Sequence, residues 1–136
     1  WTVVYGHDLE RPIWPYLEHC DAITFWTWQA RDLPELPASF GRLRRIAPDH
    51  RILLGCYMWD FGCNQPMPVD KMEYQCETGL TWLLDGRIDG MIFVASCICD
   101  LGLPAVEWTR EWISAVQSLR APEIQPNATP GAADAH

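Results

Sequence analysis

Residues 51–60 read RILLGCYMWD, and the loop FGCNQPMP follows at 61–68. The apolar run is rich in aliphatic residues and ends on Trp59 and Asp60, where glycine, asparagine and proline take over. A buried strand that delivers side chains to an open end of a sheet has this pattern. We therefore predict that the chain is organised around a strand from Arg51 to Asp60, whose exit carries candidate functional residues.

Three other apolar runs repeat this layout. They are WTVVYG at 1–6, AITFWTW at 22–28 and GMIFVASCI at 90–98, and polar residues follow each of them. Continuous hydrophobicity of this kind is typical of a strand covered on both faces, as in a parallel sheet flanked by helices. The sequence thus predicts four strands.

Helical patterns lie between and after these strands. Pro12 and Pro15 bracket a short helical turn, because proline is tolerated in the first turn of a helix and not in its interior. A basic helical pattern covers 39–46. A last helix begins at Pro104, and its apolar positions are expected to face inward with Trp112 nearby: Val106, Ile113, Val116 and Leu119.

The most regular helical pattern lies between Asp70 and Gly86. Asp70 with Glu73 three residues later resembles a capping box, with aspartate in the place of serine or threonine. Gly86 supplies a left-handed stop. Apolar residues recur at every third or fourth position, which is the spacing of one helix face: Met72, Cys76, Leu80 and Leu83.

Four strand-helix units in succession predict an α/β fold with a parallel sheet and right-handed crossovers, in one domain over residues 1–120. Residues 121–136 are rich in proline, glycine and alanine and poor in large apolar groups, so we expect a disordered C-terminal tail. Ligands of parallel sheets and barrels bind at the carboxyl ends of the strands. All four strand exits are therefore expected on one rim.

The charge balance restricts the class of partner. The chain has 10 basic and 18 acidic residues, for a formal net charge of −8. Such a chain has no surplus of positive charge for phosphate backbones or anionic membranes, so neither nucleic acid nor a membrane is expected as a partner. No apolar run reaches the length of about 18 residues that a membrane span needs, which predicts a soluble chain.

Six cysteines are irregularly spaced and include no C-x-x-C pair. Cys56, Cys76 and Cys97 fall in apolar strand or helix patterns, where a thiol usually behaves as a small buried hydrophobe. A disulfide that involves Cys63 or Cys99, and a metal site, are the alternatives. No metal or cofactor is expected, and the chain lacks a G-x-S-x-G elbow, a P-loop and a G-x-G-x-x-G turn.

The order of WTVVYGHD at 1–8, AITFWTW at 22–28, RILLGCYMWD at 51–60 and GMIFVASCICD at 90–100 resembles the C-terminal half of a (β/α)8 barrel of the glycoside-hydrolase type. The four segments stand in the places of strands five to eight, and the resemblance covers residues 1–115. It implies half of a TIM-type barrel with a sugar-directed catalytic or binding face. The large retaining clan has a glutamate at the seventh-strand exit, where this chain has Asp60, and its acid/base glutamate follows a fourth strand that this sequence does not contain.

Carboxylates follow all four predicted strands. Glycoside hydrolysis needs two carboxyl groups that flank the scissile bond, about 5 to 9.5 Å apart. We predict Asp60 and Asp8 as the catalytic pair, since Asp60 follows a tryptophan that would disfavour its charged form and suit a general acid. The alternative for Asp60 is a hydrogen-bonding role in the loop. The other rim carboxylates are Glu10 and two that can serve as turn or helix caps, Asp32 and Asp100.

Aromatic residues near the strand exits form the second group of candidates. Trp28, Trp59, Tyr57 and His7 are predicted to line the substrate site, since flat indole faces suit the apolar faces of sugar rings. Alternation along a strand places Trp26 on the same face as Trp28. Core packing is the alternative for the tryptophans, and a hydrogen-bonded structural role is the alternative for His7.

Two functional hypotheses follow from the sequence. The first is a carbohydrate-active protein, a glycoside hydrolase or a fragment of one, whose partner is a carbohydrate substrate. The second is a noncatalytic binding or assembly module that completes a barrel with a partner chain, since a parallel sheet with unpaired edges tends to associate. In the second case the partner is a second copy of the chain, as a homodimer, or a missing N-terminal half-barrel.

Overall fold

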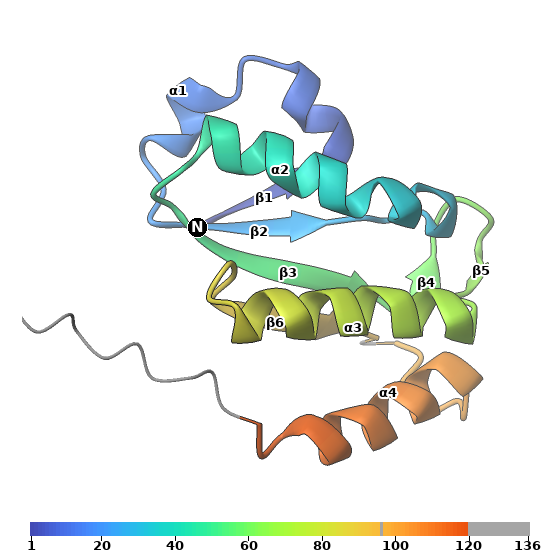
Figure 1. Cartoon of the computed structure of the whole chain (residues 1–136). Helices are drawn as coiled ribbons and strands as arrows, with labels where there is room; N and C mark the ends of the chain where they lie inside the picture. The colour runs from blue at the N-terminus through green and yellow to red at the C-terminus, as the bar shows by residue number, and fades with distance from the viewer. Residues whose placement is uncertain (96, 120–136) are drawn as a thin grey trace, which may run out of the picture.

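Four parallel strands form the central sheet of the computed structural model, which describes residues 1–95 and 97–119 (Figure 1). The order across the sheet is β1-β2-β3-β6, which is also the order along the chain. The predicted parallel α/β fold is therefore confirmed, and the carboxyl ends of the four strands share one rim. The strands are β1 (Thr2–Tyr5), β2 (Ala22–Trp26), β3 (Arg51–Tyr57) and β6 (Gly90–Val94).

Helices connect and follow the strands, and α2 and α3 lie on the same side of the sheet (Figure 1). This arrangement is expected, because successive right-handed crossovers that all advance in one direction place their helices on one face. The α-helices are α1 (Trp14–Leu17), α2 (Leu36–Ile46), α3 (Val69–Leu84) and α4 (Pro104–Val116). Two 3-10 helices follow the first two strands: η1 (Gly6–Glu10) directly after β1, and η2 (Ala30–Glu35) three residues after β2.

The core lies between the sheet and these helices. Phe25 and Leu54 are in register on neighbouring strands and are fully buried. The α3 backbone approaches this face so closely that a Cβ on Gly79 would lie 2.9 Å from the Leu54 side chain. Phe40 from α2 and Trp82 from α3 stack with ring centroids 4.2 Å apart. Burial of these side chains supplies the main driving force for folding.

The opposite face of the sheet is also apolar, and we call it the bare face. Within the described residues the core helices pack on the other side, and Val3 on the bare face keeps 41% of its surface exposed. The indole of Trp26 lies over Gly55 on this face, where a Cβ would come within 2.0 Å of the ring. Register and alternation place these side chains on it: Val3, Tyr5, Thr24, Trp26, Leu53, Tyr57, Ile92 and Val94.

The predicted strand from Arg51 to Asp60 is wrong at its carboxyl end. β3 stops at Tyr57, and the next residues form a separate hairpin in which β4 (Trp59–Asp60) pairs antiparallel with β5 (Gln65–Pro66). The Met67 N–H donates to the Met58 carbonyl, so the chain turns away from the parallel sheet at this point. Asn64 has a left-handed φ of 51°, a conformation that asparagine tolerates in turns.

Other boundaries differ from the prediction in smaller ways. β2 ends at Trp26, so Trp28 lies beyond the strand, and β6 ends at Val94. The predicted capping box is wrong, because α3 begins after Pro68 and has no side-chain hydrogen bond at its N-cap. The predicted stop is confirmed by Gly86, which has φ 70°.

The last helix is buried only at its beginning. Ala105, Val106 and Thr109 are buried, whereas Ile113 and Leu119 are exposed, so the prediction that all its apolar positions face inward is wrong. This difference arises because α4 packs against the rest of the described residues through its first turns, while its C-terminal end lies in solvent. The predicted tail at 121–136 lies outside the described residues. Among the described residues, no helix is long and apolar enough to cross a membrane.

Candidate functional site

A cleft of about 210 Å³ lies at the carboxyl ends of β1 and β2. We call it the rim cleft. It forms because each strand is followed by a 3-10 helix, directly after β1 and three residues after β2. These helices turn polar side chains back over the sheet edge, while α2 closes the third side. The lining residues are Gly6, His7, Glu10, Trp26, Thr27, Trp28, Asp32, Glu35, Ser39 and Arg42.

Two tryptophans line the rim cleft. Trp26 is almost fully buried, and its Nε1 donates a 2.9 Å hydrogen bond to Thr24 Oγ1. Trp28 is 39% exposed. The first indole is thus held in place by packing and a hydrogen bond, and the second offers surface to a ligand. Trp28 lies beyond the end of β2, so the predicted alternation along the strand does not reach it, but both indoles line the same cleft.

Charged side chains surround these rings. The cleft brings together three carboxylates, from Glu10, Asp32 and Glu35, and one guanidinium, from Arg42. Arg42 Nη2 donates to Ser39 Oγ at 3.1 Å, which orients the guanidinium. The site therefore offers both acceptors and a donor beside aromatic surface.

His7 is the remaining side chain in the cleft that the sequence predicts. Its ring stacks on Tyr5 with centroids 5.5 Å apart and planes 5° from parallel. Its Nε2 lies 3.5 Å from Asp8 Oδ1, and more than half of the side chain is exposed. The contacts support the structural role that we kept as an alternative, and the exposed ring still reaches the cleft.

Asp8, one of the two predicted catalytic carboxylates, holds the start of η1. Its Oδ2 accepts a 2.9 Å hydrogen bond from the Tyr5 N–H. Asp8 does not belong to the lining of the rim cleft. The arrangement resembles helix capping, in which an aspartate satisfies a free backbone donor.

Asp60, the other predicted catalytic carboxylate, is only 3% exposed. Its Oδ1 accepts hydrogen bonds from the N–H groups of Ala30 at 3.1 Å and Gly62 at 3.0 Å. The side chain thus ties the β4–β5 hairpin to the start of η2. This geometry fits the loop hydrogen-bonding role better than contact with a substrate.

Trp59 and Tyr57 lie apart from the rim cleft. Trp59 lines an apolar groove of about 250 Å³ together with Phe61, Val94, Ala95, Cys97 and Ile98. Cys97 is exposed there, so the prediction of a buried thiol at this position is wrong. Its strand ends at Val94, and the chain beyond no longer packs in the sheet.

Tyr57 joins the aromatic layer of the bare face. Its hydroxyl lies 3.2 Å from the Tyr5 hydroxyl, and its ring centroid lies 4.6 Å from that of Trp26. Burial, and secondarily the hydrogen bond to Tyr5, raise the pKa of the Tyr57 phenol well above its usual value of 10.0. The phenol is therefore neutral near pH 7 and does not supply a proton-accepting oxyanion.

The six cysteines are all free. Cys56 on β3 and Cys76 on α3 are buried next to each other, and the Cys76 thiol together with burial raises the pKa of Cys56. A hydrogen bond with the Asp100 carboxylate raises the pKa of Cys99. No group of three or more histidine, cysteine, aspartate or glutamate side chains in residues 1–95 and 97–119 could hold a metal ion.

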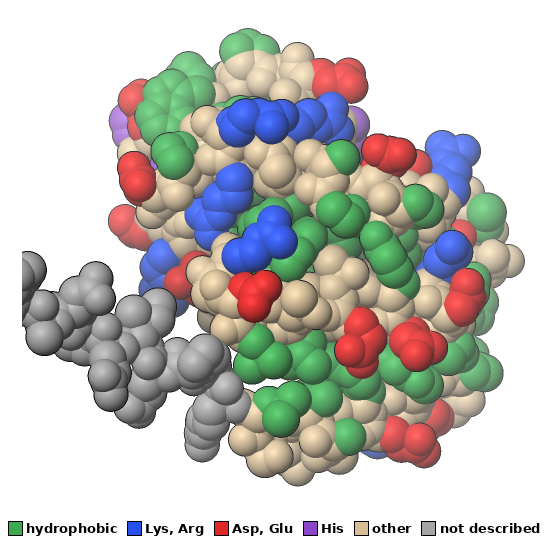
Figure 2. Space-filling model, viewed as in Figure 1, with side chains coloured by type: hydrophobic (Ala, Val, Ile, Leu, Met, Phe, Trp, Pro, Cys, Tyr) green, Lys and Arg blue, Asp and Glu red, His purple; other side chains and the backbone are tan. Residues whose placement is uncertain are grey.

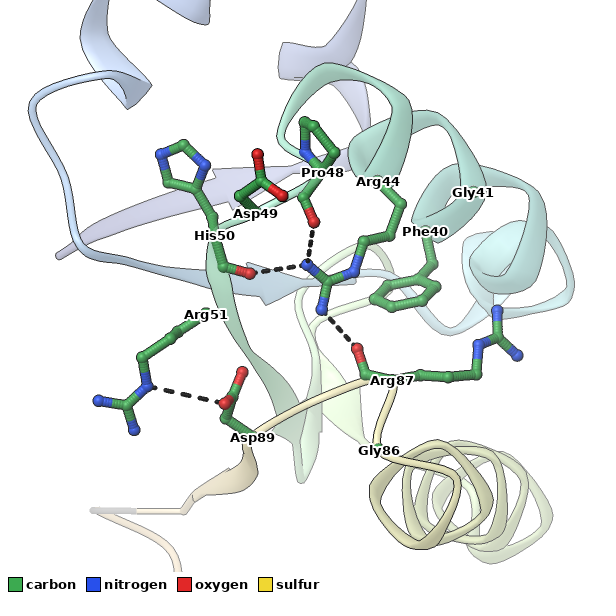
Figure 3. A pocket seen from close by; sticks show the side chains of 10 residues that line it. All are labelled: Phe40, Gly41, Arg44, Pro48, Asp49, His50, Arg51, Gly86, Arg87 and Asp89. Carbon is green, nitrogen blue, oxygen red and sulfur yellow. Dashed lines mark hydrogen bonds and ion pairs between the residues drawn. The ribbon is translucent and has the colours of Figure 1, made fainter. Parts of the chain in front are cut away.

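A larger cavity, of about 530 Å³, lies at the opposite end of the sheet, near the amino end of β3 (Figure 3). Arg44 is directed into it and donates to the backbone carbonyls of Pro48, His50 and Arg87 (Figure 3). Burial lowers the pKa of the Arg44 guanidinium, while the nearby Asp89 carboxylate raises it.

Two further arginines of this cavity are also engaged by neighbouring side chains. Arg51 Nε lies 3.6 Å from Asp89 Oδ1, and the Arg87 guanidinium lies over the Phe40 and Trp82 rings at 5.2 and 5.0 Å from the ring centroids. These contacts join α2, the start of β3 and the turn after α3. We therefore assign this cavity a structural role, which is typical of the amino-terminal end of a parallel sheet.

Glu35, Ser39 and Arg42 in the rim cleft were missed by the sequence analysis. Asp32 and Glu35 are three residues apart, and in a 3-10 helix such side chains eclipse one another. A 3-10 helix around Pro34 would have been the signal for this pair, but residues 29–37 carry only a loop-like pattern.

Comparison of the chain with family models, with curated proteins and with solved structures gave no match.

Proposed function

We propose that the rim cleft binds a carbohydrate, and that the ligand is small, such as the terminal residue of a glycan. The observation that supports this most is the partly exposed Trp28 beside buried Trp26, with carboxylates around them. Ligand sites combine apolar walls with a few polar groups that set orientation. The volume of about 210 Å³ lies below the range of roughly 300 to 1,000 Å³ that drug-sized ligands occupy, which favours a single sugar ring.

The mixture of donors and acceptors supports a neutral polyhydroxy ligand. Glu10, Asp32 and Glu35 can accept hydrogen bonds from sugar hydroxyl groups, and Arg42 can donate to ring or hydroxyl oxygens. An ammonium ligand would also suit the carboxylates and indoles, but it has no acceptor for the Arg42 guanidinium. A sugar can use both the acceptors and the donor of the cleft, and this supports a sugar as the ligand.

Hydrolysis is a narrower version of this proposal. It requires two carboxyl groups on either side of a glycosidic bond. Asp8 and Asp60 are engaged by backbone N–H groups, so the carboxyl groups that support a hydrolytic role are those of the cleft itself. We propose binding as the primary activity, and hydrolysis as an activity that would depend on Glu10 and Glu35.

The test is the affinity of the chain for a panel of mono- and disaccharides, measured by isothermal titration calorimetry. Trp28→Ala should weaken binding of the preferred sugar at least tenfold, since it removes the exposed aromatic wall. Trp14→Ala is the matched control, because Trp14 is also a partly exposed tryptophan but lies on α1 outside the cleft lining. Equal loss in both variants, binding of choline in place of sugars, or no binding across the panel would contradict the proposal.

A cleavage assay separates binding from hydrolysis. The wild-type chain and the Glu10→Gln and Glu35→Gln variants are incubated with chromogenic aryl glycosides of the sugars that bind. Turnover that is lost in either variant, with binding retained, supports the hydrolytic version. Turnover that is unaffected by both changes assigns the reaction to other residues.

A further inference from the structure

The bare face extends across all four strands, and the rim cleft shares only Trp26 with it. Parallel sheets occur almost only with both faces covered, since their strands are apolar on both sides. Here the helices of the described residues cover one face, and the other presents an apolar layer from all four strands. In register across the sheet at one level are Tyr5, Trp26, Gly55 and Ile92. A sheet of this kind is expected to be covered in the working protein.

The two edges of the sheet are the second feature. β1 pairs only with β2, and β6 pairs only with β3, among the strands of the described residues. Their outer backbone N–H and C=O groups therefore have no strand partner there. Free strand edges pair readily with another chain. Because all four strands are parallel, both edges run in the same direction.

Exposed hydrophobic residues gather next to both edges. On the β1 side Trp1 is 79% exposed, and Val3 in the strand itself is 41% exposed. On the β6 side, α4 packs by its Trp112 ring against Phe93 of β6 and leaves Ile113 exposed. Hydrophobic side chains are visible both near α1 and along the seam between α3 and α4 (Figure 2). Large apolar patches of this kind mark protein interfaces.

We infer that two copies of this chain associate about a two-fold axis, with β1 of each copy beside β6 of the other, so that the two bare faces enclose one eight-stranded parallel barrel. Each chain supplies four strand-helix units, which is half of the number in a closed barrel of this class. A two-fold axis makes the same contact twice and leaves no edge free. This inference is independent of carbohydrate binding.

A second copy suits the bare face better than a charged partner does. Within the residues of β1, β2, β3 and β6, Arg51 is the one charged side chain. Its Nε lies 3.6 Å from Asp89 Oδ1. The net charge of −8 therefore lies outside the strands that would meet. An eight-stranded barrel is just wide enough for side chains to fill its interior. The aromatic layer of Tyr5, Trp26 and Tyr57 would supply bulky side chains for that interior.

The test is the mass of the chain in solution, measured by sedimentation velocity and by light scattering from about 1 to 100 µM. The expected species has twice the chain mass of 15.6 kDa. Val3→Glu on the β1 edge and Ile113→Glu on α4 should each shift the dimer to monomer and raise the dissociation constant at least a hundredfold. The control is Tyr74→Glu, since Tyr74 is 38% exposed on α3, away from both edges.

Two edge variants keep the test decisive if one of them fails to fold, which circular dichroism would show. A wild-type chain that remains monomeric at 100 µM would overturn the inference, and would indicate that a different segment covers the bare face. A dimer that survives both edge changes, or that Tyr74→Glu disrupts equally, would place the contact elsewhere and also overturn it.

Discussion

The contact between Trp26 and Gly55 provides a sensitive test of how the rim cleft is built. In Gly55→Ala, the new Cβ would lie 2.0 Å from Trp26 Cδ2 and 2.1 Å from Cε3. Carbon atoms pack favourably at about 3.5 to 4.0 Å. The indole must therefore move away from the new Cβ by more than about 1 Å. A shift of that size would disturb the Nε1 hydrogen bond to Thr24 and the packing against Tyr57.

The cost of Gly55→Ala follows from these losses. Overpacking costs about 1 to 3 kcal/mol, the hydrogen bond contributes about 1 kcal/mol and the aromatic pair about 0.5 to 1.5 kcal/mol. Replacing glycine stabilises by about 0.4 to 1 kcal/mol through the unfolded chain. We expect a net destabilisation of about 1.5 to 5 kcal/mol.

Urea denaturation followed by circular dichroism measures this change. Gly41→Ala is the matched control, since Gly41 lies inside α2 with nothing within 4 Å of its Cβ position, and it should stabilise by up to about 1 kcal/mol. In a Trp26→Ala background, Gly55→Ala should cost almost nothing. A Gly55→Ala protein as stable as the wild type would refute the packing that we describe.

Three further predictions concern stability, pH and thiol reactivity. Asp60→Ala should lower the free energy of unfolding by about 2 to 3 kcal/mol, since it leaves the buried Ala30 N–H and the partly buried Gly62 N–H without their acceptor, and Asp60→Asn should cost less; equal urea midpoints for wild type and Asp60→Ala would count against a structural role. The raised pKa of Tyr57 means that the unfolded chain loses this proton first, so stability is fully present below about pH 10 and falls as the pH rises further. Tyr57→Phe should remove that part of the slope in urea titrations at pH 8 to 11, and an unchanged slope would contradict it. Cys63 and Cys97 should react with a thiol reagent in the native protein, and buried Cys56 and Cys76 only after unfolding, as mass spectrometry of labelled peptides would show; rapid native labelling of Cys56 would be inconsistent with the core.

The strand and helix order could be predicted from the sequence because it depends on local pattern. The apolar runs and the period of α3 led directly to the parallel sheet. The meeting of His7 and Trp28 in one cleft also follows from chain order, since β1 and β2 are neighbours with Tyr5 opposite Trp26.

The position of Asp60 could not be predicted in the same way. Apolar character continues through Met58 and Trp59, so nothing local separates the end of β3 from the two-residue strand β4. The separation depends on the pairing of Met58 with Met67, which is a non-local contact. Glu35 and Arg42 were missed for a related reason, because their place in the cleft depends on how η2 and α2 pack on the sheet.

The most direct test of carbohydrate binding at the rim cleft is a ¹H–¹⁵N NMR titration of the chain with the sugar that binds best. We predict that shifts concentrate on the Trp28 indole N–H, on η1 and η2, and on the N-terminal part of α2. Shifts confined to the Arg44 cavity at the other end of the sheet, or no saturable shifts at all, would contradict the proposal.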